Sequence, residues 1–316
     1  MNTTVNLDFS RIFIVFFRWL PIIFNSMNSR SDRETIIENF DWNQLSLEQL
    51  KLIQSRINQA IDFKRNELYL TNSNTKNTLI YRYKASVSKV SPARLRSSLS
   101  EYQKCIFGIS LGSKNFVNRG RIEGCLKWIS ENFNACLVLV TDSIYRLTIE
   151  VRQGLKGDEA RSEAVRTGEQ FINQNYSLFE QYSGNCQFQL KTTSEIEKRS
   201  DFKTYYEELE KLYKKNESFH GLVNLFVQQY LNRVQQVETE EVDELRQHLG
   251  IIYFLEESAI NACLSEQGWQ VAVYPGSIKT FEDISEGLHS EVPLPLQQMV
   301  WVSLRLKKSN AKSEKE

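Results

Sequence analysis

One serine stands at a position where a parallel sheet can carry out chemistry. A short apolar run, residues 105–110, leads into the pattern Gly108-Ile-Ser-Leu-Gly112. This pattern predicts a buried strand with Ser110 at its carboxyl end and small residues beside it. Open α/β sheets place their ligand sites at that edge. A serine there can act as a nucleophile when a base or an activated substrate assists it.

A serine hydrolase is the first enzyme class to consider, because Gly-x-Ser-x-Gly is the nucleophile motif of the α/β-hydrolases. Such an enzyme needs a histidine base and an acid that orients it. The chain has three histidines, and only His289 follows the last candidate acid, in an expected loop. No His-Gly-Gly-type oxyanion motif precedes Ser110. A hydrolase that uses Ser110 and His289 therefore remains the alternative.

A phenol and a carboxylate share one face of a later apolar helix. Tyr253 and Glu257 are four residues apart, so their side chains lie one above the other. Burying a carboxylate costs free energy unless a cation is paired with it. We therefore expect Glu257 to bind a cationic ligand group such as an α-ammonium. Tyr274 ends an apolar strand further along the chain. If that strand is parallel to the first, Tyr274 and Ser110 share one edge of the sheet.

The segments that must position these groups alternate between strand and helix patterns. The continuous apolar run 135–140 is typical of a strand buried on both faces. The alternation predicts an α/β fold with a parallel, doubly wound sheet flanked by helices. We expect strands at 105–110, 135–140, 188–193, 269–274 and 298–306, and helices at 121–133, 157–182, 200–213, 222–234 and 242–264, the last broken or bent near Gly250.

The charges balance, since Lys+Arg and Asp+Glu both number 39. A polyanionic partner would therefore have to bind a local patch of positive charge, because the chain as a whole has no net charge to attract it. The most basic stretch is residues 78–104, which is either a solvated surface or a phosphate-contacting patch. Its candidate phosphate contacts are Arg82, Lys84, Lys89, Arg94 and Arg96.

The chain lacks the sequence motifs of several classes of enzyme. The chain has no His-Glu-x-x-His, no paired-cysteine motif, no Walker loop and no Gly-x-Gly-x-x-Gly. This disfavours a metal or nucleotide enzyme. Five cysteines without a CxxC spacing predict buried free thiols in the reducing cytoplasm.

Three regions differ in composition. Residues 1–75 read as an N-terminal extension with an amphipathic helix and an apolar segment at 12–24, which is too short to span a bilayer. We expect no stable membrane insertion, and Met27 is an alternative start. Residues 76–306 form the catalytic domain, and the Lys/Ser/Glu-rich tail 307–316 is expected to be disordered.

The separated motifs together resemble those of the tRNA-dependent cyclodipeptide synthases. That family combines Gly-x-Ser at a strand end, Tyr-x-x-x-Glu on a later helix and a further tyrosine, as in Gly108–Ser110, Tyr253–Glu257 and Tyr274. The resemblance covers residues 100–306. Ser113 and Pro275 are similar to the XYP branch of the family, which is named after a variable residue, Tyr and Pro.

The resemblance implies a fold and a mechanism. The fold would be Rossmann-like, similar to the catalytic domain of class I tyrosyl- and tryptophanyl-tRNA synthetases, without cofactor, metal or ATP. Two aminoacyl-tRNAs would be converted to a cyclic dipeptide (a diketopiperazine) through aminoacyl- and dipeptidyl-enzyme intermediates on Ser110. Tyr253 and Glu257 would hold the α-amino group, and Tyr274 would assist cyclisation. The partners would be the two aminoacyl-tRNAs and not DNA, and the enzyme would be a cytoplasmic monomer.

The resemblance also implies substrate contacts. The first side-chain pocket would be lined by Ile106, Gly108, Leu139, Ile260 and Ala272, with Ser113 and Asn232 as further substrate-binding positions.

The tRNA-binding helix of the well-studied branch is strongly basic, whereas its equivalent here, 158–176, has only Arg161 and Arg166 as cations. We therefore place tRNA binding, at least in part, on the basic stretch from Arg82 to Lys104. A third alternative is an inactive tRNA-binding module of synthetase-like fold.

Overall fold

The computed structural model describes residue 46 and residues 82–234 and 240–309. The elements below belong to the second of the two units of the chain, Arg65–Glu316. The expected N-terminal extension, residues 1–75, lies outside the described residues except for Ser46. Within the described parts, no helix is long and apolar enough to cross a membrane.

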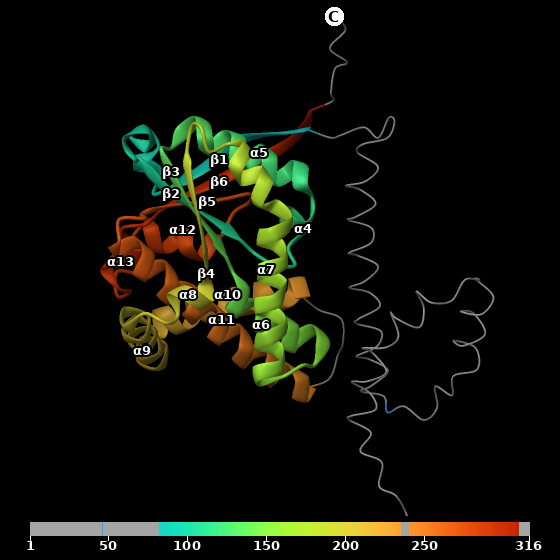
Figure 1. The fold of residues 1–316 in the computed structure, drawn as a ribbon. Helices are drawn as coiled ribbons and strands as arrows, with labels where there is room; N and C mark the ends of the chain where they lie inside the picture. Colours follow the sequence, from blue (N-terminus) through green and yellow to red (C-terminus); the bar gives the residue numbers. More distant parts are fainter. Residues whose placement is uncertain (1–45, 47–81, 235–239, 310–316) are drawn as a thin grey trace, which may run out of the picture. The chain divides into compact units, whose positions relative to one another are not determined.

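Six strands form one sheet: β1 (Arg82–Ser91), β2 (Lys104–Ile109), β3 (Ala135–Val140), β4 (Gln187–Thr192), β5 (Val271–Tyr274) and β6 (Val300–Ser309). They are ordered β1-β6-β5-β2-β3-β4 (Figure 1). The five strands from β6 to β4 run parallel, as expected from the sequence. The strand order reverses at β2, which is hydrogen-bonded to both β3 and β5. This reversal creates a crevice at the carboxyl end of β2, where open sheets bind ligands.

The sequence did not predict β1, which pairs antiparallel with β6 at the edge of the sheet. The expectation of a purely parallel sheet is therefore corrected to a mixed sheet. The basic and polar residues of this segment resemble a surface stretch, because one of its two faces is solvated. An antiparallel edge strand on an otherwise parallel sheet is common in α/β folds.

Helices flank the sheet, which confirms the α/β class. The five expected helices are present, and one further helix, α6 (Asp142–Gln153), was missed. In Figure 1, α9 (Ser200–Lys215), α10 (Glu217–Val234) and α11 (Glu240–Glu266) lie together beyond one end of the strands. The longer helices are α5 (Arg119–Asn132), α6 (Asp142–Gln153), α7 (Gly157–Gln181), α9 (Ser200–Lys215), α10 (Glu217–Val234) and α11 (Glu240–Glu266). The short ones are η3 (Ala93–Leu95), η4 (Leu99–Glu101), α4 (Lys114–Val117), α8 (Thr193–Ile196), α12 (Lys279–Ser285) and α13 (Leu294–Gln297).

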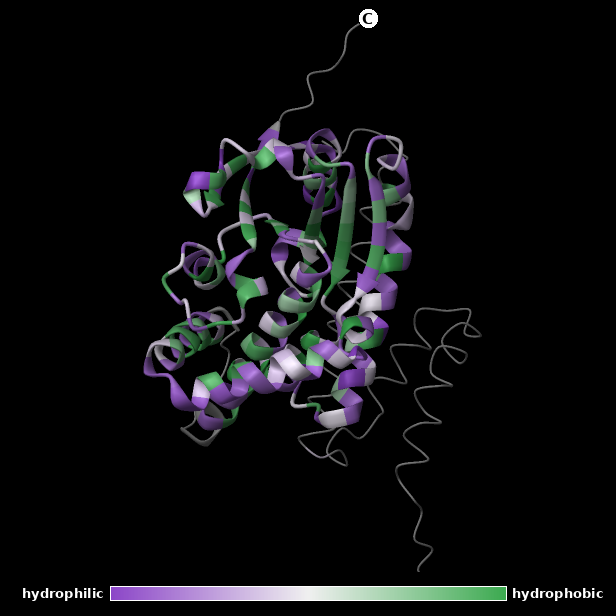
Figure 2. Ribbon diagram, turned by 90° about the vertical axis from the view of Figure 1, so that its left-hand side faces the viewer, coloured by the Kyte–Doolittle hydropathy of each residue, from purple (hydrophilic) through white to green (hydrophobic). Residues whose placement is uncertain are grey.

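The inner strands are buried on both faces, as the apolar run 135–140 predicted. Alternate residues of β3 belong to two separate cores: Leu137 and Leu139 face the α10–α11 side, and Cys136 and Val138 the α5–α7 side. Figure 2 accordingly shows largely hydrophobic inner strands beside helices that carry both hydrophobic and hydrophilic residues. The sheet is therefore a rigid platform for groups at its carboxyl edge.

Helix α11 runs without interruption through Gly250, so the expected break there is wrong. A Cβ atom at this position would lie 2.8 Å from a γ-carbon of Val227 on α10. The glycine permits close helix packing instead of ending the helix. Continuity matters because α11 carries Tyr253 and Glu257.

Candidate active site

A pocket lies at the carboxyl edge of β2, β3 and β5. Its walls are mostly apolar and include a few polar groups. This is the general character of small-ligand sites. The lining residues are Ile106, Gly108, Ser110, Leu139, Thr141, Ile144, Thr193, Glu257, Ile260, Asn261, Ala272, Val273, Tyr274, Ile278 and Trp301.

Ser110 and Tyr274 meet at this pocket from two neighbouring parallel strands. Ser110 directly follows β2, and Tyr274 is the last residue of β5. The Tyr274 hydroxyl donates a hydrogen bond to Ser110 Oγ at 3.3 Å. The sequence placed both at one sheet edge, and the structure adds that their hydroxyls are within reach of each other.

The chain turns sharply after Ser110, and this turn exposes the serine. The N–H of Ser113 donates to the Ser110 carbonyl at 3.1 Å, and Gly112 adopts a φ of 76°. That conformation favours glycine. A Cβ atom at Gly112 would also lie 2.9 Å from the ring of Tyr145. Both constraints explain the second glycine of the motif.

Helix α11 presents a carboxylate to the same pocket. Glu257, Ile260 and Asn261 lie on one helix face and line the wall, and the Asn261 amide donates to the Glu257 carbonyl at 2.9 Å. Tyr253, one turn earlier, is not among the lining residues. Its ring packs against Tyr230 of α10, with a centroid distance of 4.9 Å.

The expected side-chain pocket can be compared with the observed one. All five of its positions, Ile106, Gly108, Leu139, Ile260 and Ala272, line the cavity. The two further positions lie elsewhere. Ser113 caps α4 by accepting a hydrogen bond from the N–H of Asn115 at 3.3 Å, and Asn232 is exposed on α10.

Sequence reasoning missed seven lining residues. Asn261 and Trp301 carried usable signals: Asn261 is four residues after Glu257, and Trp301 lies inside an expected strand. Ile144 belongs to α6, which was not expected, so it gave no signal. The missed residues are Thr141, Ile144, Thr193, Asn261, Val273, Ile278 and Trp301.

The loops after the two hydroxyl-bearing strands are joined to each other. Asn115 Nδ2, in α4 beyond Ser110, donates to the Pro275 carbonyl at 2.7 Å. Arg121 of α5 donates in turn to Asn115 Oδ1. This connection fixes the relative positions of the Ser110 turn and the Tyr274 loop.

Asp142 anchors the far side of the pocket. Its buried carboxylate accepts hydrogen bonds from Thr193 Oγ1 at 2.9 Å, from the N–H of Ser194 at 2.8 Å and from Ser194 Oγ at 2.6 Å. The start of α6 is thereby tied to the start of α8. Thr193 and Ile144, which both line the pocket, are held in place by this contact.

The geometry does not favour a hydrolase. Within the described residues, no histidine lines the pocket. His289 Nδ1 lies 3.3 Å from Ser218 Oγ and 3.5 Å from Glu291 Oε1. Its neighbours are therefore not those of a base for Ser110. No cluster of His, Cys, Asp and Glu suited to a metal ion occurs in the described part of the chain either.

The comparison with known families decides the class. The cyclodipeptide synthase family matches residues 93–260, more than half of the chain. The chain belongs to the cyclodipeptide synthase family. It is therefore an aminoacyltransferase, since members of this family are enzymes that make cyclodipeptides from aminoacyl-tRNAs. The matched region contains the Ser110 turn, Tyr253 and Glu257.

Solved structures of similar proteins share the fold of this synthase. A cyclodipeptide synthase from Fluoribacter dumoffii is 22% identical with a TM-score of 0.60, over 72% of this chain and 100% of that one. One from Bacillus thermoamylovorans is 17% identical with a TM-score of 0.53, over 72% and 97%. One from Candidatus Glomeribacter gigasporarum, bound to Phe-tRNAPhe, is 19% identical with a TM-score of 0.51, over 71% and 97%. No curated protein sequence matches the chain.

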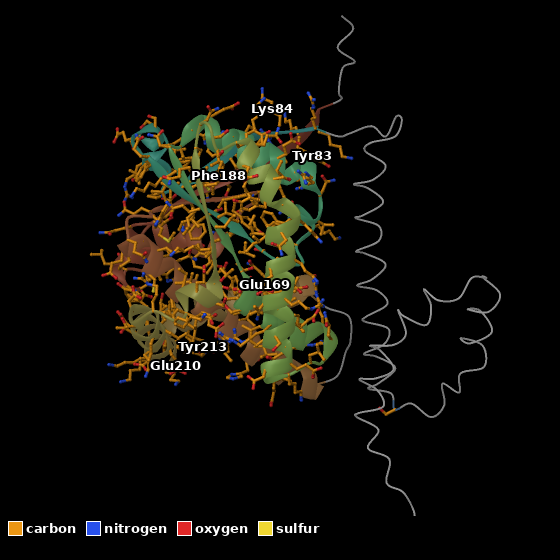
Figure 3. All side chains as sticks on the ribbon, in the orientation of Figure 1. Tyr83, Lys84, Glu169, Phe188, Glu210 and Tyr213 are labelled. Atoms are coloured by element: carbon orange, nitrogen blue, oxygen red, sulfur yellow. The ribbon has the colours of Figure 1, made fainter. Side chains whose placement is uncertain are left out.

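The basic stretch of the synthase lies on two elements. Arg82 and Lys84 are exposed on β1, and Lys84 lies at the outer rim of the domain (Figure 3). Arg94 and Arg96 are exposed in and just after η3. Lys89 differs from these four, because its ammonium lies 2.6 Å from the buried carboxylate of Glu282.

Strand β6 extends to Ser309, so residues 307–309, which were expected to belong to a disordered tail, are part of the sheet. The strand adds cations that the sequence did not single out. Lys307 is opposite Lys84, and Arg305 is opposite Ser86, so their side chains share a face with Arg82. We call Arg82, Lys84, Arg305 and Lys307 the cationic face. Like charges directly opposite each other in a sheet are destabilising. An anionic ligand on this face would offset that repulsion.

Proposed function

We propose that this synthase joins the aminoacyl groups of two aminoacyl-tRNAs into a cyclic dipeptide, with Ser110 as the nucleophile. The supporting observation is the Tyr274–Ser110 contact of 3.3 Å beside a pocket that Glu257 also lines. A hydroxyl nucleophile, a proton donor and a site for an ammonium group are thus close together. The Phe-tRNAPhe bound by the Candidatus Glomeribacter gigasporarum protein supports aminoacyl-tRNA as the substrate.

In the first step Ser110 Oγ attacks the ester carbonyl of an aminoacyl-tRNA. The ester bond to the ribose breaks, the ribose oxygen takes the proton of the serine, and an aminoacyl-enzyme forms. The ester is already activated, so no histidine base is required. Backbone N–H groups near Gly112 would stabilise the developing oxyanion.

Glu257 would bind the α-ammonium of the aminoacyl group, with Tyr253 one helical turn away. A carboxylate in a mostly apolar pocket attracts a cation strongly, because water screens the charges little there. The aminoacyl side chain would then lie among Ile106, Leu139 and Ala272, which line the apolar part of the pocket.

In the second step the amine of the aminoacyl-enzyme attacks the ester of the second aminoacyl-tRNA, and the second tRNA leaves. The resulting dipeptidyl-enzyme carries a new free amine. That amine attacks the Ser110 ester, which closes the ring and releases the serine oxygen. Tyr274 would donate its proton to this departing oxygen and accept one from the attacking amine. Its hydrogen bond to Ser110 Oγ matches this role.

Mass spectrometry of medium from a bacterial host that expresses the chain tests the proposal. A new cyclic dipeptide should appear, and its mass identifies the two amino acids. Hydrolysis of simple esters without a cyclic product would favour the alternative hydrolase. In that case His289→Ala should abolish activity, whereas the synthase should keep its activity.

Ser113 and Pro275 support membership of the XYP branch, which stays a prediction.

Neutralising Arg94 and Arg96 to glutamine should weaken aminoacyl-tRNA binding. Each lost phosphate contact should lower the slope of log affinity against log salt concentration by about one. Filter binding across a salt series measures this slope. The matched control is Lys198→Gln with Lys211→Gln, which removes two exposed cations elsewhere. An unchanged slope would remove η3 from the tRNA site.

Substituting Gly108 by alanine should narrow the aminoacyl pocket. A Cβ atom at this position meets no atom within 4 Å, so the protein itself should accommodate it. The added methyl would occupy space for the substrate, and we expect the ratio of products to shift toward smaller side chains by about tenfold. Gly184→Ala, in an equally open position outside the pocket, is the control. An unchanged product ratio would show that the side chain does not reach Gly108.

A further inference from the structure

We propose that Glu282 is a positioning residue for the aminoacyl pocket, and that Lys89 neutralises this carboxylate instead of contacting tRNA. The inference rests on the proposed function and goes beyond it. It assigns a role to α12, and it removes one cation from the expected tRNA-binding set. The supporting observations are the contacts of a single buried carboxylate.

The Glu282 carboxylate gathers donors from three separate segments. Its Oε1 accepts from Ser277 Oγ at 2.7 Å, from Ser303 Oγ at 3.0 Å and from the N–H of Ile278 at 3.3 Å. Its Oε2 accepts from Lys89 Nζ at 2.6 Å. The Glu282 side chain is only 2% exposed. A buried carboxylate with this many donors connects its surroundings firmly.

The segments held in this way form part of the pocket wall. Ile278 lines the pocket, and it lies in the loop that follows Tyr274. Ser303 is two residues beyond Trp301 on β6, and Trp301 also lines the pocket. Glu282 therefore supports one wall at two points and fixes the exit of the strand that carries Tyr274.

The residue next to Glu282 supports the same wall directly. Phe281 stacks on Trp301 with a centroid distance of 4.7 Å and an interplanar angle of 16°. Phe254 of α11 also stacks on Phe281, at 5.4 Å. A shift of α12 would therefore move the indole of Trp301 as well as Ile278. The Glu282 carboxylate adds a second, polar connection between α12 and the sheet.

Lys89 is unsuited to phosphate binding because acids surround it. Besides Glu282, the carboxylates of Asp283 and Glu286 act on its charge, and Glu286 Oε1 accepts from the N–H of Ala93 at 2.9 Å. Burial opposes the charged form of Glu282, yet hydrogen bonds from Lys89, Ser277 and Ser303 hold its pKa below the ordinary value. A phosphate near Lys89 would be repelled by this cluster. Lys84 lies instead on the cationic face, opposite Lys307.

Glu282→Gln tests the positioning role. It keeps the size of the side chain but removes the charge, and the amide can satisfy fewer of the four donors. We expect the rate of cyclodipeptide formation per folded protein to fall by about ten- to a hundredfold. We also expect the ratio of products to change, because the Trp301–Ile278 wall moves. A purely structural role would lower the melting temperature and leave the product ratio unchanged, which would overturn the proposal.

The matched control is Asp283→Asn, which removes a carboxylate from the same helix. Asp283 pairs with Lys279 and does not line the pocket. Its rate and product ratio should match those of the wild type. Ser303→Ala removes one hydrogen bond from Glu282, and we expect a smaller change in the same direction as Glu282→Gln. This milder variant keeps the test decisive if Glu282→Gln folds poorly.

Lys89→Met and Lys84→Met test whether each lysine contacts tRNA or neutralises a buried carboxylate. Lys84→Met should lower the affinity for deacylated tRNA severalfold, and Lys89→Met should leave it nearly unchanged. Lys89→Met should instead lower both the rate per folded protein and the melting temperature, and adding Glu282→Gln should restore part of the melting temperature, because an unpaired buried charge is then removed. Loss of tRNA affinity in Lys89→Met, without rescue by Glu282→Gln, would overturn the assignment.

The proposed function is tested separately in the same experiment. The wild type should form product, and Ser110→Ala should form none. The Lys89 and Glu282 variants are then compared with the wild type only through their rates, product ratios and tRNA affinities.

Discussion

Ser110→Ala should abolish cyclodipeptide formation and lower the rate by roughly a thousandfold or more. The substitution removes the only oxygen that Tyr274 contacts at the pocket among the described residues, and with it the site of both covalent intermediates. The fold should be unaffected, because Ser110 lies in a half-buried turn and the turn is held by its backbone carbonyl.

Two measurements check this expectation. Product analysis should find the cyclic dipeptide for the wild type and for Ser183→Ala, a control that changes an exposed serine distant in sequence from the motif. Intact-protein mass spectrometry after a brief reaction should find an aminoacyl adduct on the wild type and none on Ser110→Ala. Product from Ser110→Ala at a near-normal rate would reject covalent catalysis at this residue.

Arg146→Met should destabilise the fold by about 3 kcal/mol, the lower end of the cost of breaking a buried ion pair. Arg146 of α6 donates from both of its terminal nitrogens to the carboxylate of Glu256 on α11, one of these bonds at 2.9 Å. The two side chains are only 16% and 11% exposed. The substitution would leave Glu256 buried without its cation.

The loss of stability in Arg146→Met should depend on pH in a definite direction. Burial already raises the pKa of Glu256, although Arg146 opposes the effect. Loss of Arg146 raises this pKa further. A carboxyl with a raised folded-state pKa binds its proton more tightly when folded, so stability is greatest at acidic pH and falls as pH rises through that pKa. The difference in free energy of unfolding between the wild type and Arg146→Met should therefore become smaller on acidification.

Urea unfolding of the wild type and of Arg146→Met over a pH series measures this difference. The double variant Arg146→Met with Glu256→Leu should be more stable than Arg146→Met alone, because it buries no unpaired charge. Equal stability of the single and double variants at every pH would contradict the explanation. Because Glu256 is adjacent to Glu257, this pair also bears on how α11 presents its carboxylate to the pocket.

The sequence by itself determined the local features of the site. Apolar runs of strand length predicted β2, β3 and β5, because strands buried on both faces require continuous apolar residues. Chain direction then placed Ser110 and Tyr274 at one sheet edge. Helical spacing placed Tyr253 and Glu257 on one face of α11. Each of these inferences depends on residues that are neighbours in the chain.

Only the tertiary structure decided which groups contact each other across the fold. The charge of Lys89 looked like part of a basic patch, but its partner Glu282 is 193 residues away. Strand β1 is stabilised by pairing with β6 near the other end of the chain, so its local pattern did not indicate a strand. Such contacts depend on the packing of whole elements, which residue spacing does not encode. For the same reason, the packing of α11 in the fold brings Glu257 and Asn261 to the pocket and leaves Tyr253 against Tyr230.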